Sequence, residues 1–94
     1  MMILDIQQIQ AQVRRIARIG NVAFSWHCKN DSMIGRNVDS LDVLKVLRSG
    51  VLSQEPDPDN EMKFRVVGED IQKKELTVII DLYDEDSLTV ITVW

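Results

Sequence analysis

The 94-residue sequence predicts an α+β fold, with N-terminal helices packed on a small, mostly antiparallel sheet of three to five strands. Apolar residues recur at helical spacing in the first half of the chain, and they alternate with polar residues in the second half. Short turn-forming segments separate the alternating stretches, which favours hairpins and therefore antiparallel pairing. The length fits a single domain over residues 1–94, with a helical segment at 1–20.

The first helix is expected over residues 4–18, because its apolar residues share one helix face: Ile6, Ile9, Val13 and Ile16. Asp5 lies in the first turn and three arginines lie in the last turns, an arrangement that matches the helix dipole. Gly20 is placed to end this helix, since glycine readily adopts the left-handed conformation that follows helix C-termini.

Two shorter segments come next, before a second well-defined helix. Residues 22–25 are apolar and form either a short strand or an extended lead-in. Residues 27–36 are expected to be weakly helical, because they include an asparagine and a glycine. Asp39 or Ser40 then caps a helix with a leucine stripe, and Gly50 ends it.

The second half of the chain has the two-residue period of β-strands. Strands are predicted at 51–54, 62–66, 76–82 and 88–94. Pro56 and Pro58 end the first strand, and turns at 68–72 and 84–86 separate the later ones. The last strand is apolar on both faces, which favours an interior position in the sheet.

Charge is distributed unevenly along the chain. The net charge of −4 argues against a broadly basic nucleic-acid-binding protein. Residues 1–50 hold seven Lys/Arg and four Asp/Glu, a net charge of +3, whereas residues 51–94 hold four and eleven, a net charge of −7. The asymmetry permits a local basic surface on an acidic protein, or it reflects solvated acidic loops.

The cysteine content and the apolar runs indicate a cytoplasmic protein. A single cysteine, Cys28, cannot form an internal disulfide and fits a reducing compartment. No apolar run is long enough to span a membrane, and the N-terminus lacks the features of a signal peptide.

The sequence offers few side chains suited to acid–base and phosphate chemistry. Cleavage of a phosphodiester without a metal needs a base, an acid and cations that stabilise the charged phosphorane. His27 is the only histidine, and histidine has an unperturbed pKa near neutrality, so it is the candidate base or acid. Arg36 is the candidate phosphate fork and Arg65 a second clamp. Further residues could contact RNA or a partner: Lys29 and Arg48 by charge, and Trp26, Trp94, Phe24 and Tyr83 by stacking.

Each of these residues also has a structural interpretation. His27 could cap or pack at a helix start, and Cys28 could pack as a small apolar residue. Arg36 could pair with Asp31 or Asp39, and Arg65 could pair across strands with Glu75 or Asp81. Trp26 and Trp94 could anchor the core or a partner interface. No cofactor or metal is expected, because the acidic run at 84–86 lacks the ligand spacing of a calcium loop.

Six short motifs occur in a recognisable order: Ser25-x-His27, Met33-x-x-Arg36, and the segments 43–50, 65–68, 76–80 and 91–94. Together they resemble the bacterial domain of unknown function 4258 family over residues 22–94. The resemblance implies a RelE/BrnT-type toxin fold, in a group whose members are often endoribonucleases neutralised by an antitoxin. Two departures from the family pattern weaken the carry-over of a phosphate-binding basic cluster: Cys28 and Ser32 stand where the family usually has an alanine and an arginine. The interval from His27 to Met33 is also one residue longer than the family's usual interval.

Three functional hypotheses follow. The first is a toxin-antitoxin-type endoribonuclease with His27, Arg36 and Arg65 at its site, RNA as substrate and an antitoxin as partner. The alternative is a non-catalytic protein-interaction module, or an inactive toxin relative, that binds a basic protein through its acidic half. The third is homodimerisation through the apolar stripe of the first helix.

Overall fold

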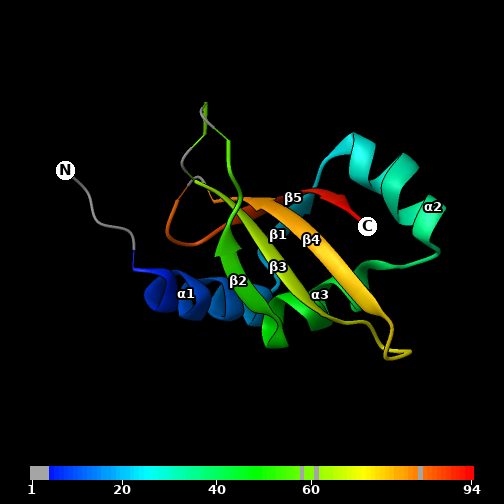
Figure 1. The fold of residues 1–94 in the computed structure, drawn as a ribbon, viewed down its shortest axis with the longest axis horizontal. Coiled ribbons are helices and arrows are strands. Elements are labelled where there is room, and N and C mark those ends of the chain that lie inside the picture. The colour runs from blue at the N-terminus through cyan, green and yellow to red at the C-terminus, as the bar shows by residue number, and fades with distance from the viewer. Residues whose placement is uncertain (1–4, 58, 61, 83) are drawn as a thin grey trace.

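The computed structural model describes residues 5–57, 59–60, 62–82 and 84–94, and it has the predicted α+β fold (Figure 1). Helices come first and strands follow, and the helices pack on one face of a single sheet. The elements are α1 (Ile6–Ile19), β1 (Val22–Phe24), η1 (Cys28–Ser32), α2 (Met33–Arg36), α3 (Ser40–Ser49), β2 (Val51–Gln54), β3 (Lys63–Glu69), β4 (Glu75–Asp81) and β5 (Leu88–Val93). No helix among these residues has the length and apolar character needed to cross a membrane.

The five strands form one mixed sheet in the order β1-β5-β4-β3-β2. The pairs β2–β3, β3–β4 and β4–β5 are antiparallel, as short connections require. Strand β1 pairs with β5 in parallel, and the elements from η1 to β4 form the long connection between the two strands. The prediction of an interior last strand is confirmed, since β5 lies between β1 and β4.

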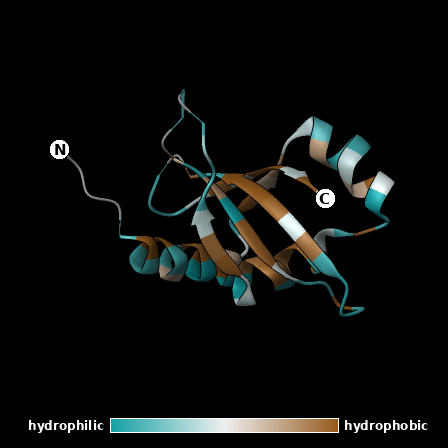
Figure 2. Cartoon of the chain, viewed as in Figure 1, coloured by the Kyte–Doolittle hydropathy of each residue, from teal (hydrophilic) through white to brown (hydrophobic). Residues whose placement is uncertain are grey.

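The main hydrophobic core lies between one sheet face and the helices α1 and α3. The apolar stripe of α1 is buried there, with Val13 and Ile16 almost fully inaccessible to solvent. The hypothesis of homodimerisation through this stripe is therefore wrong, because the sheet already covers it. Figure 2 shows the outward side of α1 and the β2–β3 loop as mainly hydrophilic and the strands as mainly hydrophobic.

Helix α1 begins at Ile6, later than predicted, and Asp5 caps it. Asp5 is the N-cap rather than a first-turn residue, and its carboxylate accepts hydrogen bonds from the N–H groups of Gln7 and Gln8. Of the predicted span 4–18, residue 4 alone lies outside the described residues, since the description begins at Asp5. Gly20 ends the helix with φ +78°, as predicted.

Helix α3 is capped by Asp39, which resolves the choice between Asp39 and Ser40. The Asp39 carboxylate accepts from the Asp42 N–H at 3.1 Å, and the Asp42 carboxylate accepts from the Asp39 N–H at 3.1 Å. The second oxygen of Asp42 accepts from the N–H of Ile71, at 3.0 Å, and so joins this helix to the β3–β4 turn. The hydrogen bonds from the N–H groups of Asp39 and Ile71 lower the pKa of Asp42.

Gly50 and Gly68 allow α3 to approach the sheet closely. A Cβ on Gly50 would lie 2.7 Å from the Val46 carbonyl oxygen and 2.8 Å from that of Val67. A Cβ on Gly68 would lie 3.1 Å from the Cα of Gly50. The prediction of a turn at 68–72 is wrong at its start, because Gly68 belongs to β3 and serves this contact instead of a turn.

Gly50→Ala is expected to lower the free energy of unfolding by about 1–3 kcal/mol, because backbone atoms occupy the space of the new methyl group. Urea denaturation followed by circular dichroism measures this change. The matched control is Gly35→Ala, where no atom lies within 4 Å, and it should stabilise the helix by about 0.5–1 kcal/mol. Equal stabilities of the two variants would contradict the close approach.

Asp42→Asn is expected to reduce stability at neutral pH by roughly 1 kcal/mol, because an amide offers one acceptor oxygen where the carboxylate offers two. The folded-state pKa of Asp42 is lowered, so its contribution is complete above the unfolded value of about 3.9 and is lost as pH falls through the folded value. Thermal melts of both proteins from neutral to acid pH should therefore converge at low pH. Asp59→Asn, at an exposed loop position, is the control and should change little. A difference between Asp42→Asn and wild type that is independent of pH would contradict this account.

Candidate functional site

Residues 26–36 form one continuous helix interrupted by a π turn, which we call the bulged helix. The Met33 N–H binds the Cys28 carbonyl five residues earlier, where a regular α-helix would use a four-residue step. The wider turn places Cys28 and Met33 on the same side, and both are buried in the core. In a regular helix, a five-residue step would separate them by about 140°. The π turn thus allows both side chains to enter the core.

Ser25 fixes the start of the bulged helix on the sheet. Its hydroxyl accepts from the Cys28 N–H at 3.0 Å and donates to the Ile91 carbonyl at 2.9 Å. Ile91 is available because a β-bulge in the β4–β5 pairing leaves it without a cross-strand partner. This contact explains the serine of the Ser-x-His motif as an N-cap that orients the helix carrying His27.

His27 lies at the surface, with 60% of its side chain exposed. Its Nδ1 atom is 3.4 Å from Oδ2 of Asp31, one helical turn further on. The packing interpretation of His27 is therefore wrong, and no side-chain capping hydrogen bond involves it. The neighbouring Cys28 is buried, and this burial raises the pKa of its thiol despite a hydrogen bond from Ser32 that lowers it. Cys28 therefore packs as a small apolar residue, as its structural interpretation predicted.

Arg36 ties the end of the bulged helix to the sheet. Its Nη2 donates to the Glu75 carbonyl oxygen at 2.7 Å, at the start of β4. The predicted pairing of Arg36 with Asp31 or Asp39 is wrong, since the guanidinium reaches the strand instead. This hydrogen bond uses one of the N–H donors of the guanidinium. Arg36 itself remains exposed at the end of the helix.

Arg65 lies in the middle of β3, where its guanidinium contacts an acid and an aromatic ring. Its Nε donates to Oε2 of Glu55 at 2.9 Å, and its guanidinium carbon is 5.6 Å from the centroid of the Trp94 ring. The predicted pairing of Arg65 with Glu75 or Asp81 is wrong, because the register places Glu75 and Asp81 opposite other residues of β3.

The three candidate catalytic residues have separate sets of contacts. His27 and Arg36 lie on the bulged helix, whereas Arg65 lies on β3, separated from β1 by β4 and β5. No pocket is formed within the part of the chain that the structure describes. Lys29 and Arg48 are exposed on the bulged helix and on α3. The catalytic roles and the RNA contacts of these residues remain predictions, and Tyr83 lies outside the described residues.

One face of the sheet carries a cluster of side chains that no described helix covers, and we call it the uncovered face: Val51, Arg65, Val67, Ile79 and Trp94. Figure 1 shows β2, β3 and β4 in front of α1 and α3, with this face toward the viewer. Ile79 is only 2% exposed, although it lies outside the main core. The register explains this burial, because it places Arg65 on one side of β4 and Trp94 on the other. The two side chains contact each other across that strand.

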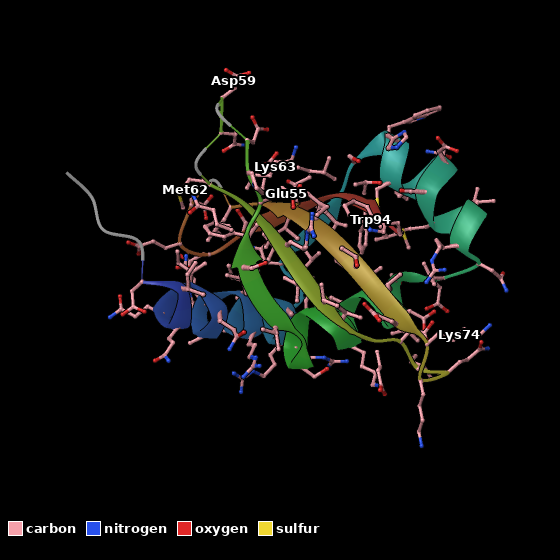
Figure 3. All side chains as sticks on the ribbon, viewed as in Figure 1. Glu55, Asp59, Met62, Lys63, Lys74 and Trp94 are labelled. Carbon is pink, nitrogen blue, oxygen red and sulfur yellow. The ribbon has the colours of Figure 1, made fainter. Side chains whose placement is uncertain are left out.

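Two acidic side chains beside the uncovered face pair with cations of β3. Glu55 pairs with Arg65 at 2.9 Å, and Asp57 pairs with Lys63 at 3.3 Å (Figure 3, where Glu55, Lys63 and Trp94 are labelled). No local pattern in the sequence indicates Glu55 as a partner of Arg65, because a hairpin brings it beside Arg65 from ten residues away. The i,i+4 spacing of His27 and Asp31 was a signal that could have indicated their pairing.

The remaining acidic segment, 84–86, is a solvated turn as predicted. The N–H of Asp86 and the hydroxyl and N–H of Ser87 bind the Asp84 carboxylate and lower its pKa. Arg15 of α1 pairs with Asp86 at 3.0 Å and holds this turn against the helix. Within the described ranges, no group of three or more His, Cys, Asp or Glu side chains is arranged to hold a metal ion.

Comparisons with known proteins agree with the motif order found in the sequence. No curated protein and no solved structure shows significant similarity to the chain. A family model described as "Domain of unknown function (DUF4258)" matches residues 24–94, from the end of β1 to the end of the sheet. This match includes the bulged helix and the uncovered face but leaves out α1. Because the model covers most of the sequence, the chain belongs to the DUF4258 family.

Proposed function

We propose that this protein is a protein-interaction module that binds a partner with a basic rim through the uncovered face. The observation that carries the proposal is the contact between Arg65 and Trp94 on a sheet face without a helix. Trp94 is 49% exposed there, and the Arg65 side chain is 41% exposed. Tryptophan and arginine are the residues most enriched where binding energy concentrates in protein interfaces.

The two side chains are held in place before a partner arrives. Glu55 is largely buried and fixes the Arg65 guanidinium through its carboxylate. The Trp94 backbone exchanges two hydrogen bonds with Thr77, at 2.8 and 2.9 Å, which fixes the position of its ring above β4. A surface ordered in this way loses little conformational freedom on binding, so more of the contact energy appears as affinity.

Charge favours a protein over RNA at this face. Arg65 and Lys63 each already pair with a carboxylate, so neither is an uncompensated cation for a phosphate. Residues 51–94, which supply most of this face, have a net charge of −7. A partner with an apolar centre and basic residues around it would complement both the tryptophan and the net negative charge of residues 51–94.

Trp94→Ala is expected to weaken partner binding by roughly 2 kcal/mol, about thirtyfold, since it removes the central aromatic group. Wild-type, Trp94→Ala and Trp26→Ala proteins would be immobilised and the bound proteins compared quantitatively. Trp26→Ala is the matched control, because Trp26 is exposed on the bulged helix away from this face. A basic protein should be retained by wild type and the control and lost from Trp94→Ala.

The protein identified in this way would then be purified and its affinity measured by calorimetry at increasing salt. The affinity should fall with salt and should follow the same order among the three variants. The proposal fails if no bound protein depends on Trp94. It also fails if fluorescently labelled single-stranded RNA binds at low salt with an affinity that depends on Trp94 and Arg65.

A second candidate function is metal-independent RNA cleavage, which the His27–Asp31 pair supports. An aspartate that faces Nδ1 of a histidine orients the ring and leaves Nε2 free, an arrangement used by general bases. Trp26 and Lys29 are exposed on the same helix, as an aromatic surface and a cation that could contact RNA. The resemblance to RelE/BrnT-type toxins points in the same direction.

If the protein cleaves RNA, His27→Ala should lower the rate at least about a hundredfold, because general acid–base catalysis typically contributes that much. Purified protein would be incubated with labelled RNA in the presence of EDTA, and the fragments followed by gel electrophoresis. Asn30→Ala, an exposed neighbour on the same helix, is the control and should leave the rate unchanged. Intact RNA at high protein concentration, or equal cleavage by His27→Ala, would eliminate this candidate.

A further inference from the structure

The two edges of the sheet are protected differently. At the β2 edge, the side chain of Gln10 accepts from the Leu52 N–H at 2.9 Å, and Arg14 donates to the Gly50 carbonyl at 3.1 Å. Both side chains come from α1, which therefore occupies the backbone groups that a further strand would need. This edge is closed to strand addition.

The opposite edge, β1, has no such cover. The Asn21 carbonyl accepts from the Leu88 N–H, and the Ser25 N–H donates to the Val90 carbonyl, so these residues direct their backbone toward β5. In a strand the backbone direction alternates, and Val22 and Phe24 therefore direct their N–H and C=O groups outward. Among the described residues, none donates to or accepts from these outward groups.

Apolar side chains accompany this open edge. Val22 and Phe24 are only half-buried at the margin of the core. Ile19 is 60% exposed just before the strand, and Trp26 is 78% exposed just after it. An edge with unpaired backbone groups and apolar residues at both ends is a surface for an added strand.

We propose that β1 pairs with β1 of a second copy of this chain in an antiparallel, two-fold symmetric dimer. The backbone of an extended strand matches alternating N–H and C=O groups along the whole edge, so the occupant is a polypeptide strand. The register of β1 is self-complementary about Ala23. Val22 of each copy then faces Phe24 of the other, and each such pair exchanges two hydrogen bonds.

The side chains fit this arrangement as well as the backbone does. Ala23 would face its own copy at the symmetry axis in a non-hydrogen-bonded pair, where the Cα atoms approach to about 4.5 Å. Its methyl group is small enough for that approach, and it is exposed in the single chain. Antiparallel pairing brings the start of one strand beside the end of the other, so Ile19 of each copy would lie near Trp26 of the other.

The dimer would join two sheets into one and would bury Val22 and Phe24 more fully. It uses the β1 edge, which the uncovered face does not include, so it does not depend on the proposed function. A contact of three residues per strand is small, and we expect a dissociation constant between about 10 μM and about 1 mM.

Sedimentation equilibrium over this concentration range measures the dimer directly. The mass should rise toward twice the 10.8 kDa of the single chain. Ala23→Lys should weaken dimerisation at least tenfold, because it places two like charges opposite each other at the axis. Ala11→Lys makes the same substitution on the exposed side of α1 and should dimerise like wild type.

Trp26→Ser is a second variant, since it leaves the strand intact and removes the flanking ring. It should weaken the dimer about tenfold while the circular dichroism spectrum stays unchanged. Amide exchange provides an independent measurement at single residues. The Val22 and Phe24 amides should become protected as protein concentration rises, whereas the Ser25 amide, which already binds β5, should be protected throughout.

A strict monomer at about 1 mM would overturn the proposal. So would a dimer that survives Ala23→Lys with unchanged affinity, because it would use another surface. Val22 and Phe24 amides that exchange fast at every concentration would also reject it, even if the protein self-associates. The protein could instead stay monomeric and bind an extended peptide of another protein at β1. That result would show that a second copy of this chain is not the strand that pairs with β1.

Discussion

Helices cover only one face of the sheet, and the rest of the structure depends on this constraint. Helices α1 and α3 cover one face, and the Gly50–Gly68 approach lets α3 pack close to the strands. The central strand β4 is nevertheless buried on both sides, so Ile79 needs cover that no described helix provides. Arg65 and Trp94 provide that cover by meeting across β4. The same contact that shields Ile79 therefore creates the most distinctive surface of the molecule.

The bulged helix shows how a small change in spacing is absorbed without loss of the core. A five-residue interval separates Cys28 from Met33, and only a π turn lets both side chains enter the core. Ser25 at one end and Arg36 at the other fix this helix to β5 and β4. As a result the helix exposes its outer side, including His27 and its partner Asp31, while its position on the sheet stays fixed.

The surfaces of the molecule differ in charge and in free backbone groups, and each therefore suits a different kind of partner. Paired acids compensate the cations of the uncovered face, which favours a protein ligand there over a phosphate chain. Helix α1 lies outside the matched family region, closes the β2 edge and binds the 84–86 turn. The β1 edge keeps its backbone groups free, which makes it the surface for strand pairing among the described residues.

The sequence by itself determined the fold class, most of the elements, the glycine ends of the helices and the family. These features depend on local periodicity, capping and motif order, which are properties of neighbouring residues. The sequence also indicated Arg65 and Trp94 as candidate contact residues. It predicted ion pairs of Arg65 with Glu75 or Asp81, but these acids lie opposite other residues of β3.

Only the tertiary structure decided which distant groups meet. The parallel pairing of β1 with β5, the Arg65–Glu55 and Arg65–Trp94 contacts and the bond from Arg36 to the Glu75 carbonyl all join separate segments. Strand register and chain return set these contacts, and neither can be read from the spacing of residues along one segment. The placement of His27 apart from the contacts of Arg65 is a consequence of the same strand order.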